Sequence, residues 1–373
     1  MRASHLRSLT EQEPPFVSVH IDDSHDTENA EHELSLRWRA VREDLVDAGA
    51  KQRVVDLVED TLLRSAPPVG ASGRSIVATK SGVHLDARLV RPPVRTVARH
   101  SALPYLVPLI EHGVSSTLQV VAVVDHTGAD VLELTGTSVA HRETVDGVGS
   151  PVHHASGAET AGPGDPQRRS DEQSRKNIAA AVDHLCAIVD RRRPERVYVV
   201  GETTSLADLH AAAPSRLADV LHNLPIGARG SGLSESDILA AVAQADERRR
   251  NEVLDATARR FDAEIHREEG LAVEGLTAVC GALRNGEVDT LVIGDIGDAT
   301  VVDDGSPTTV APTAANLSEL GAAPERVLRA DEALPMLAIA TDADLVRVDE
   351  RVSPTDGVGA LLRYLPRTSA GDR

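Results

Sequence analysis

The sequence predicts an α/β protein made of three mixed α/β domains. Short, strand-like apolar segments alternate along the 373 residues with longer segments whose apolar residues recur every three or four positions, as on one face of a helix. A chain of this length ordinarily forms two or three domains. We place them at residues 1–116, 117–270 and 271–373. The middle domain is expected to carry an inserted loop over residues 147–171, because that stretch is rich in Gly, Pro and Ser.

The first domain begins with a buried strand and two amphipathic helices. FVSVHI, residues 16–21, is typical of a strand, and it ends at a turn rich in Asp. Two apolar stripes at helical spacing follow, the first made of Leu34, Trp38, Val41 and Leu45 and the second of Val54, Val58 and Leu62. RSIVAT and GVHLDA, on either side of Lys80, predict a hairpin.

The middle domain opens with a hairpin, in which LQVVAVVD and ADVLELT flank a turn at residues 126–128. After the loop, EQSRKNIAAAVDHLCAIVDRRR predicts a long helix and RVYVVG a buried strand. SRLADVLHN, residues 215–223, fits a helix or a strand equally well. Ser234 and Asp237 have the spacing of a capping box, so we expect a helix from there to about Glu269.

The last domain alternates helices and strands, which favours an α/β/α sandwich. GLTAVCGALRNG predicts a helix that stops at Gly286, and ADEALPMLAIATDA predicts a second helix. Four segments are typical of strands: VDTLVIGD, ATVVDD, DLVRVD and VGALLRY.

Composition argues against a membrane protein and against a protein that coats nucleic acid. The longest apolar runs have the length of a strand, and the first residues lack the apolar stretch of a signal peptide. The formal net charge of -19 repels phosphate at long range, which speaks against DNA as a partner. Cys186 and Cys280 form neither a disulfide framework nor a zinc motif. We therefore expect a cytoplasmic protein without a metal or another cofactor.

The turn HIDDSHD, residues 20–26, combines two histidines with three acids. His20 and Asp22 fall on one face of the strand, which is compatible with a metal site. No further cluster completes that site, and a turn rich in Asp and Ser explains the residues without metal. A second use is hydrogen bonding to RNA bases or 2′-hydroxyl groups by three residues of this loop: Ser24, His25 and Asp26.

Asp125 ends the first strand of the middle domain, where ribonuclease-H-like nucleases place a metal-binding carboxylate, and Glu133 lies on the partner strand. Such nucleases need several acids around two metal ions, and the remaining ligands are not identifiable in the sequence. We therefore favour a solvated turn aspartate over a nuclease. The sequence also lacks the GxSxG, Walker A, GxGxxG and HExxH motifs.

Several motifs carry a family resemblance. ALRNGEVDTLVIGD, followed much later by DGVGALLRY, is similar to the C-terminal domain of archaeal and eukaryotic class-1 release factors and of Pelota. In that family a strand resembling GIGAILRY closes the sheet, and six residues here match it: Gly357, Gly359, Leu361, Leu362, Arg363 and Tyr364. SVHIDDSHDT, DGVGSPVH and RADEALPMLAIA resemble the bacterial branch of the family, and within it the actinobacterial members similar to the ribosome hibernation factor Balon.

The resemblance implies both a fold and a function. The fold is a release-factor-like N-terminal domain, a ribonuclease-H-like middle domain without nuclease activity and a C-terminal domain of the kink-turn-protein type. The function is to occupy the vacant A site of an idle or stressed 70S ribosome, where the protein meets 16S and 23S rRNA. The N-terminal domain then faces the decoding centre, the middle-domain loop points toward the peptidyl-transferase centre, and EF-Tu in its GDP form is the delivery partner.

One departure from the family separates two functions. Release factors carry Gly-Gly-Gln on the loop after the first middle-domain hairpin, and its Gln positions the water that hydrolyses peptidyl-tRNA; this chain contains no Gly-Gly-Gln. We therefore expect no enzyme and no catalytic residue. The alternative is a rescue or release factor that hydrolyses peptidyl-tRNA with Gln167 or another loop residue. Besides the Ser24 loop, we expect rRNA contacts from five residues of the middle domain: Gln167, Arg168, Arg169, Arg175 and Lys176.

Overall fold

The protein, described by a computed structural model, folds into two compact units, which we call the terminal unit and the middle unit. The terminal unit comprises Met1–Val114 and Arg248–Arg373, and the middle unit comprises Ser115–Glu247. The structure describes residues 1–65, 67–68, 70–114, 118–135, 138–146, 166–229, 232–306, 308–349 and 351–365, with the backbone alone for 166–171. Among the helices of these residues, none has the length and apolar character that crossing a membrane requires.

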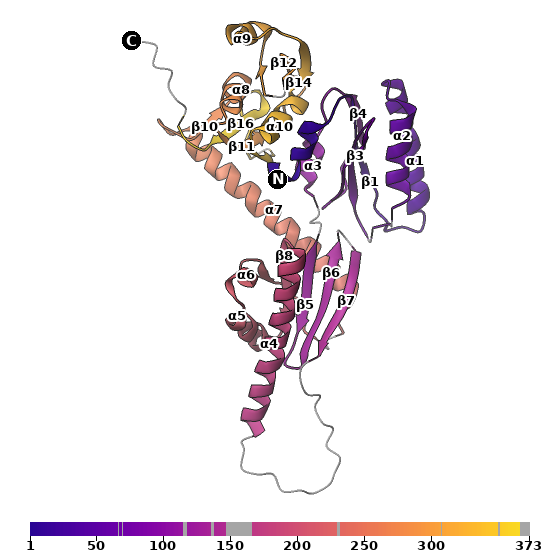
Figure 1. Ribbon diagram of the computed structural model, residues 1–373, viewed down its shortest axis with the longest axis vertical. Helices are drawn as coiled ribbons and strands as arrows, with labels where there is room; N and C mark the ends of the chain where they lie inside the picture. Colours follow the sequence, from indigo (N-terminus) through magenta and orange to yellow (C-terminus); the bar gives the residue numbers. More distant parts are fainter. Residues whose placement is uncertain are drawn as a thin grey trace. The chain divides into compact units, whose positions relative to one another are not determined.

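The first part of the terminal unit is an antiparallel sheet with two helices on one face (Figure 1). Its strands follow the order β3-β2-β1-β4, with bounds β1 Phe16–Asp22, β2 Gly73–Thr79, β3 Gly82–Leu89 and β4 Val97–Ser101. The helices are α1, Ala30–Asp47, and α2, Gln52–Leu63. Val17, Val19 and Ile21 of β1 share a core with the stripes of both helices, including Trp38. The strand, the hairpin and the two helices predicted for this region are confirmed.

The opposite face of this sheet is buried as well. Phe16 of β1 lies in one apolar core with Leu9, Leu109 and Leu337, so this core joins the beginning of the chain to its C-terminal part. The segments that contribute are η1 Ala3–His5, η2 Arg7–Glu11 and α3 Val107–His112. Because side chains alternate along a strand, Ser18 and His20 point to the same side as Phe16, and both are buried.

The C-terminal part of the terminal unit contains two sheets. The larger has the order β10-β16-β11-β15, with β10 Ala272–Glu274, β11 Val288–Ile293, β15 Asp344–Arg347 and β16 Val358–Leu362. The smaller has the order β13-β12-β14, with β12 Thr300–Asp303, β13 Val310–Ala311 and β14 Arg326–Arg329. The helices are α8 Leu276–Arg284, α9 Ala314–Glu319 and α10 Ala330–Ala340, and a 3-10 turn, η3, spans Thr355–Gly357.

Helices cover both faces of the larger sheet, as predicted for an α/β/α sandwich. Helices α8 and α10 pack on one face, and Phe261 of α7 (Glu235–Ile265) packs on the other against Val292 and Leu361. A Cβ atom on Gly359 would lie 2.5 Å from the Phe261 ring, and Gly357 has a φ of 70° beside the Asp295 carbonyl. The two motif glycines of DGVGALLRY are therefore required by close packing and by backbone conformation.

The middle unit has the strand order β7-β6-β5-β8-β9. Three strands are antiparallel, β5 Gln119–Val124, β6 Gly128–Thr135 and β7 Ser138–Asp146, and two continue the sheet in parallel, β8 Arg196–Gly201 and β9 Leu221–Asn223. Helices α4 Pro166–Arg192, α5 Thr203–Ala212 and α6 Ser215–Ala218 pack on one face (Figure 1). The first residues of α7 pack on the other face through Ile238 and Val242.

Helix α7 begins at the capping box predicted for Ser234 and Asp237. The Ser234 Oγ accepts from the Asp237 N–H (3.2 Å), and the Asp237 carboxylate accepts from the Ser234 N–H (3.0 Å).

The compact units divide the chain differently from the three predicted domains. The division falls inside α7, after Glu247, because the following residues of the helix pack on the C-terminal sheet, and the first 114 residues share a core with that sheet.

Candidate functional site

The loop predicted to contact RNA follows β1 and is fastened to the segment before β2. The Ser24 hydroxyl donates to the Ser72 carbonyl (3.1 Å) and accepts from the Ser72 N–H (2.9 Å). The His25 N–H donates to the Gly70 carbonyl (2.9 Å). The His25 side chain is half-buried and Asp26 is exposed. The structure thus brings the three residues to one end of the sheet, but the Ser24 hydroxyl already serves the fold.

The acids and histidines of this turn do not converge on a common point. His20 is buried and binds the Tyr105 carbonyl, Asp23 is ion-paired with Arg88 (2.8 Å), and Asp22 accepts from the Ser24 N–H (2.9 Å). Within the described part of the chain, no three His, Cys, Asp or Glu side chains form a group that could hold a metal ion.

The two carboxylates considered for nuclease chemistry have protein partners. Asp125 accepts from the Thr127 and Gly128 N–H groups (2.7 and 3.0 Å) and from Arg229 (3.1 Å). Burial opposes ionisation of Asp125, but the hydrogen bonds from Thr127 and Arg229 lower its pKa below the ordinary value. Glu133 is buried and ion-paired with Arg192 (3.1 Å). Asp125 is therefore a turn aspartate, but not the solvated one expected, because its side chain is only 21% exposed and is paired with Arg229.

Helix α4 carries the middle-domain residues predicted to contact rRNA. It begins at Pro166, earlier than the loop end predicted at residue 171, so the backbone of Gln167, Arg168 and Arg169 lies in its first turn. Their side chains and residues 147–165 of the predicted loop lie outside the described residues. Arg175 and Lys176 are exposed.

The residue that follows them in α4 anchors the helix to the β5–β6 turn. Asn177 is buried, and its side-chain amide donates to the His126 carbonyl of the β5–β6 turn (2.9 Å). Lys176 pairs with Glu172 one turn earlier (2.9 Å), whereas Arg175 has no ion-pair partner among the residues that the structure describes.

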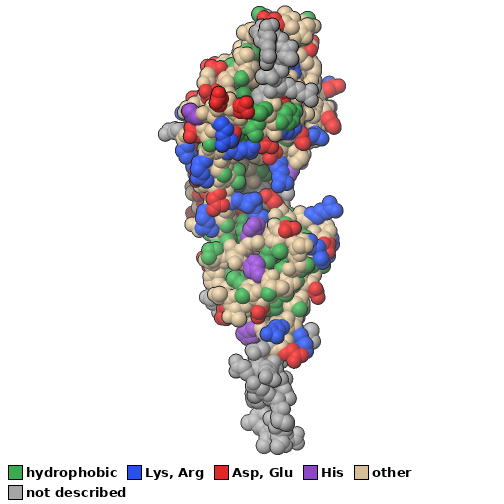
Figure 2. Space-filling view, turned by 90° about the vertical axis from the view of Figure 1, so that its left-hand side faces the viewer, with side chains coloured by type: hydrophobic (Ala, Val, Ile, Leu, Met, Phe, Trp, Pro, Cys, Tyr) green, Lys and Arg blue, Asp and Glu red, His purple; other side chains and the backbone are tan. Residues whose placement is uncertain are grey.

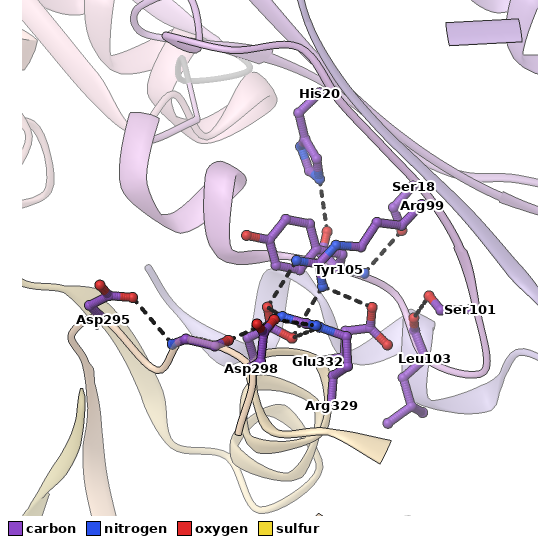
Figure 3. A network of polar contacts seen from close by, with 12 residues as sticks. Ser18, His20, Arg99, Ser101, Leu103, Tyr105, Asp295, Asp298, Arg329 and Glu332 are labelled. Atoms are coloured by element: carbon purple, nitrogen blue, oxygen red, sulfur yellow. Dashed lines mark hydrogen bonds and ion pairs between the residues drawn. The ribbon is translucent and has the colours of Figure 1, made fainter. Parts of the chain in front are cut away.

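A polar network that no sequence motif indicates joins β4 to α10 within the terminal unit (Figure 3). Arg99 donates to Asp331 (2.9 and 3.1 Å) and to Glu332 (3.0 Å), and its guanidinium lies 3.4 Å from the centroid of the Tyr105 ring. Arg329 donates to Asp331 as well (3.0 Å). The carboxylates of Asp331 and Glu332 are 11% and 4% exposed, so Arg99 compensates charges that water barely reaches.

Burial and ion pairing act in opposite directions on these two acids. Burial would raise the pKa of Asp331, but hydrogen bonds from Arg99 and Arg329 bring it below the ordinary value. Burial raises the pKa of Glu332, and the hydrogen bond from Arg99 only partly offsets it. Acids are common in the first turn of a helix because of the helix dipole, so these two residues do not by themselves indicate that α10 binds a distant arginine.

His20 connects this network to strand β1 of the sheet β3-β2-β1-β4, which we call the N-terminal sheet. Its Nε2–H donates to the Tyr105 carbonyl (2.8 Å), and the Tyr105 N–H donates to the Ser18 hydroxyl (3.0 Å). Burial lowers the pKa of His20 to about 4, and the nearby His112 and Arg99 act in the same direction. The histidine is therefore neutral at physiological pH, and the Nδ1 atom is buried without a hydrogen-bond partner among the described residues.

Charges of both signs are interspersed on the face drawn in Figure 2, where Lys and Arg side chains alternate with Asp and Glu. Many arginines are ion-paired, as Arg37 is with Glu33 and Arg196 with Asp246. On this face an external phosphate therefore meets local groups of Lys and Arg side chains rather than one continuous basic surface.

The chain is similar to a family of bacterial release factors. The family model for bacterial archaeo-eukaryotic release factor family 2 matches residues 118–267. Over 371 residues the chain is 46% identical to the uncharacterized protein Rv2629 of Mycobacterium tuberculosis (strain ATCC 25618 / H37Rv), covering 100% of this chain and 99% of that protein. The uncharacterized protein MT2704 of strain CDC 1551 / Oshkosh matches with the same identity and coverage. The chain belongs to the bacterial archaeo-eukaryotic release factor family.

Solved structures of release-factor-like proteins are also similar to the chain. Ribosome-bound archaeal Pelota is 13% identical, with 97% of this chain and 93% of that chain covered and a TM-score of 0.40. Saccharomyces cerevisiae Dom34, a translation termination-like factor, is 11% identical, with 81% of each chain covered and a TM-score of 0.41. The archaeal translation termination factor aRF1 is 14% identical, with 97% of each chain covered and a TM-score of 0.24.

Proposed function

We propose that this protein is a ribosome-associated translation factor that occupies the vacant A site of idle or stressed 70S ribosomes in the cytoplasm. One observation carries the proposal: the chain belongs to the bacterial release factor family and contains no Gly-Gly-Gln. A family member without that tripeptide keeps the shape that enters the ribosome and lacks the group that releases the peptide. The resemblance to the hibernation factor Balon supports the same role.

The proposed orientation follows the family. The N-terminal domain faces the decoding centre and meets 16S rRNA, and the segment between β7 and α4 points toward the peptidyl-transferase centre and 23S rRNA. That segment follows Asp146, the end of β7, and precedes Pro166, where α4 begins. EF-Tu in its GDP form is the proposed delivery partner. The net charge of -19 does not oppose this role, because an A-site ligand touches rRNA through local groups such as Arg175.

Purified protein is expected to sediment with vacant 70S ribosomes and to leave peptidyl-tRNA intact. The physical reason is that hydrolysis requires a positioned water, and the glutamine that supplies it in release factors has no counterpart in a Gly-Gly-Gln here. The measurement is peptide release from ribosomes carrying labelled peptidyl-tRNA, with a Gly-Gly-Gln release factor as the positive control. Release that disappears in Gln167→Ala would establish the rescue or release factor instead, and a protein that stays in the supernatant would refute ribosome association.

The double variant Arg168→Ala plus Arg169→Ala is expected to weaken ribosome binding. Each lost phosphate contact also reduces the dependence of log Kd on log salt by about 1. The control is Arg191→Ala plus Arg193→Asn at the other end of α4, where both side chains are exposed and where Asn tolerates the φ of 48° at Arg193. Sedimentation at several salt concentrations measures both quantities. Equal losses in the two variants would mean that the first turn of α4 is not a contact.

A further inference from the structure

Three segments meet at one end of the N-terminal sheet. In the register of the strands, Asp22 pairs with Gly73, Gly73 pairs with Leu89, and His20 pairs with Val97. The loop after β1, the segment before β2 and the loop from β3 to β4, residues 90–96, therefore emerge side by side. This is the end that carries Ser24, and the β2–β3 turn at Lys80 lies at the opposite end.

The loop from β3 to β4 is packed firmly at its base. A Cβ atom on Gly73 would lie 2.7 Å from Cδ of Pro93 and 3.0 Å from Cα of Pro92, so the two prolines rest directly on the strand. Pro93 is buried, and both proline rings restrict the backbone. The following residues therefore project from a fixed base rather than from a freely moving loop.

The tip of this loop exposes an aliphatic side chain between two arginines. Val94 is 91% exposed, the largest value among the exposed large hydrophobic residues that the structure describes. Arg91 and Arg95 are both exposed. Arg95 has no ion-pair partner among the described residues. The buried acid at this end of the sheet, Asp23, is ion-paired with Arg88. We call Arg91, Val94 and Arg95, together with His25 and Asp26, the sheet-end surface.

We infer that the sheet-end surface binds ribosomal RNA, an inference that rests on the proposed function. An arginine binds phosphate through its planar fork and stacks on unpaired bases, and an exposed Val beside it covers a base or ribose face. Asp26 accepts hydrogen bonds from amino groups of bases or from 2′-hydroxyls. Because Pro92 and Pro93 hold the start of the loop in place, the loop loses less conformational entropy when it binds. Loops of this kind recognise the unpaired bases of RNA rather than a regular duplex.

The opposite end of the same sheet is less suited to RNA. A groove there is lined by Arg53 and Lys80, but Asp56 and Asp60 line it too. Lys80 is also ion-paired with Glu13 (2.7 Å). A phosphate entering this groove meets two carboxylates beside two cations, whereas the sheet-end surface has one carboxylate, Asp26, beside two arginines. The charges therefore favour the sheet-end surface.

The test uses tethered cleavage of rRNA. Cys186 and Cys280 are buried, so Val94→Cys introduces an accessible thiol that can carry an iron chelate, and Ser81→Cys places the same chelate at the opposite end of the sheet. Bound to 70S ribosomes, the Val94→Cys protein is expected to cleave rRNA strands at discrete positions, and the Ser81→Cys protein several-fold less. Equal cleavage from both positions, cleavage from Ser81→Cys alone, or modification of ribosomal protein without rRNA cleavage overturns the inference.

A measurement of ribosome affinity separates this inference from the proposed function. Arg95→Ala is expected to raise the Kd for 70S ribosomes by about tenfold, the effect of losing one charged hydrogen bond. Arg53→Ala removes the same charge from an exposed arginine of the same domain and should change the Kd by less than about twofold. Wild-type protein that does not bind ribosomes refutes the proposed function, whereas binding that Arg95→Ala leaves unchanged overturns the sheet-end surface alone.

Discussion

Arg99→Ala is expected to lower the free energy of unfolding of the terminal unit by about 3 kcal/mol. The substitution leaves Asp331 and Glu332 as buried carboxylates whose remaining partners do not neutralise both charges, and it removes the cation that lies over the Tyr105 ring. Urea unfolding followed by fluorescence measures the loss, because the chain has a single tryptophan, Trp38, which is buried against the N-terminal sheet.

Two further variants test whether the loss comes from buried charge or from any link between the two ends of the chain. Arg7 pairs with Asp342 at the surface (3.2 Å), where both side chains are more than half exposed, so Arg7→Ala should cost less than about 1 kcal/mol. Arg99→Lys keeps the charge and loses the two-pronged geometry, so its cost should fall between the two. Equal effects of Arg7→Ala and Arg99→Ala would contradict the buried-charge account.

Apolar periodicity predicted most of the elements because each buried face leaves its own pattern in the sequence. It failed for β7, since most residues of SVAHRETVD are exposed and its alternation is hidden among polar side chains at a sheet edge. The ambiguous segment SRLADVLHN proved to contain both possibilities, a short helix α6 followed by strand β9. A pattern averaged over nine residues cannot separate two elements of three or four residues each.

The terminal unit could not be predicted, because it depends on contacts between residues far apart in the chain. Arg99 and Asp331 are 232 positions apart, and nothing in the local sequence of either one indicates the other. The resemblance indicated three domains in order, whereas the structure joins the first and the last through one apolar core. A distant contact also affects Ser24, which was predicted to hydrogen-bond RNA: its hydroxyl binds Ser72, a residue that the sequence alone does not place beside it.

The sheet-end surface, too, could not be predicted from the local sequence. RPPVRTV contains two prolines and lacks a clear strand pattern, so nothing in these residues indicates an exposed binding loop. The register of three strands is what places Val94 and Arg95 beside the loop of Ser24. Candidate residues in loops can thus be predicted by type, but their grouping requires the fold.

His20 is expected to make the stability of the terminal unit depend on pH. Its pKa is about 4 in the folded protein, against about 6.5 for an exposed histidine, because burial disfavours the charged ring. Between these two values the unfolded chain binds a proton that the folded chain does not, so the free energy of unfolding falls as the pH falls. From about pH 7 to about pH 5 this histidine alone should remove about 2 kcal/mol.

His20→Gln separates this effect from the titration of carboxylates. The Gln amide can donate to the Tyr105 carbonyl as the imidazole does, and it does not titrate. We expect the variant to be less stable than the wild type at neutral pH, since an amide packs imperfectly in the place of a buried ring, but to lose about 2 kcal/mol less on acidification. Urea unfolding monitored through Trp38 at several pH values gives both slopes. His32→Gln on the exposed side of α1 is the control, and parallel slopes for His20→Gln and the wild type would show that the buried imidazole is not the titrating group.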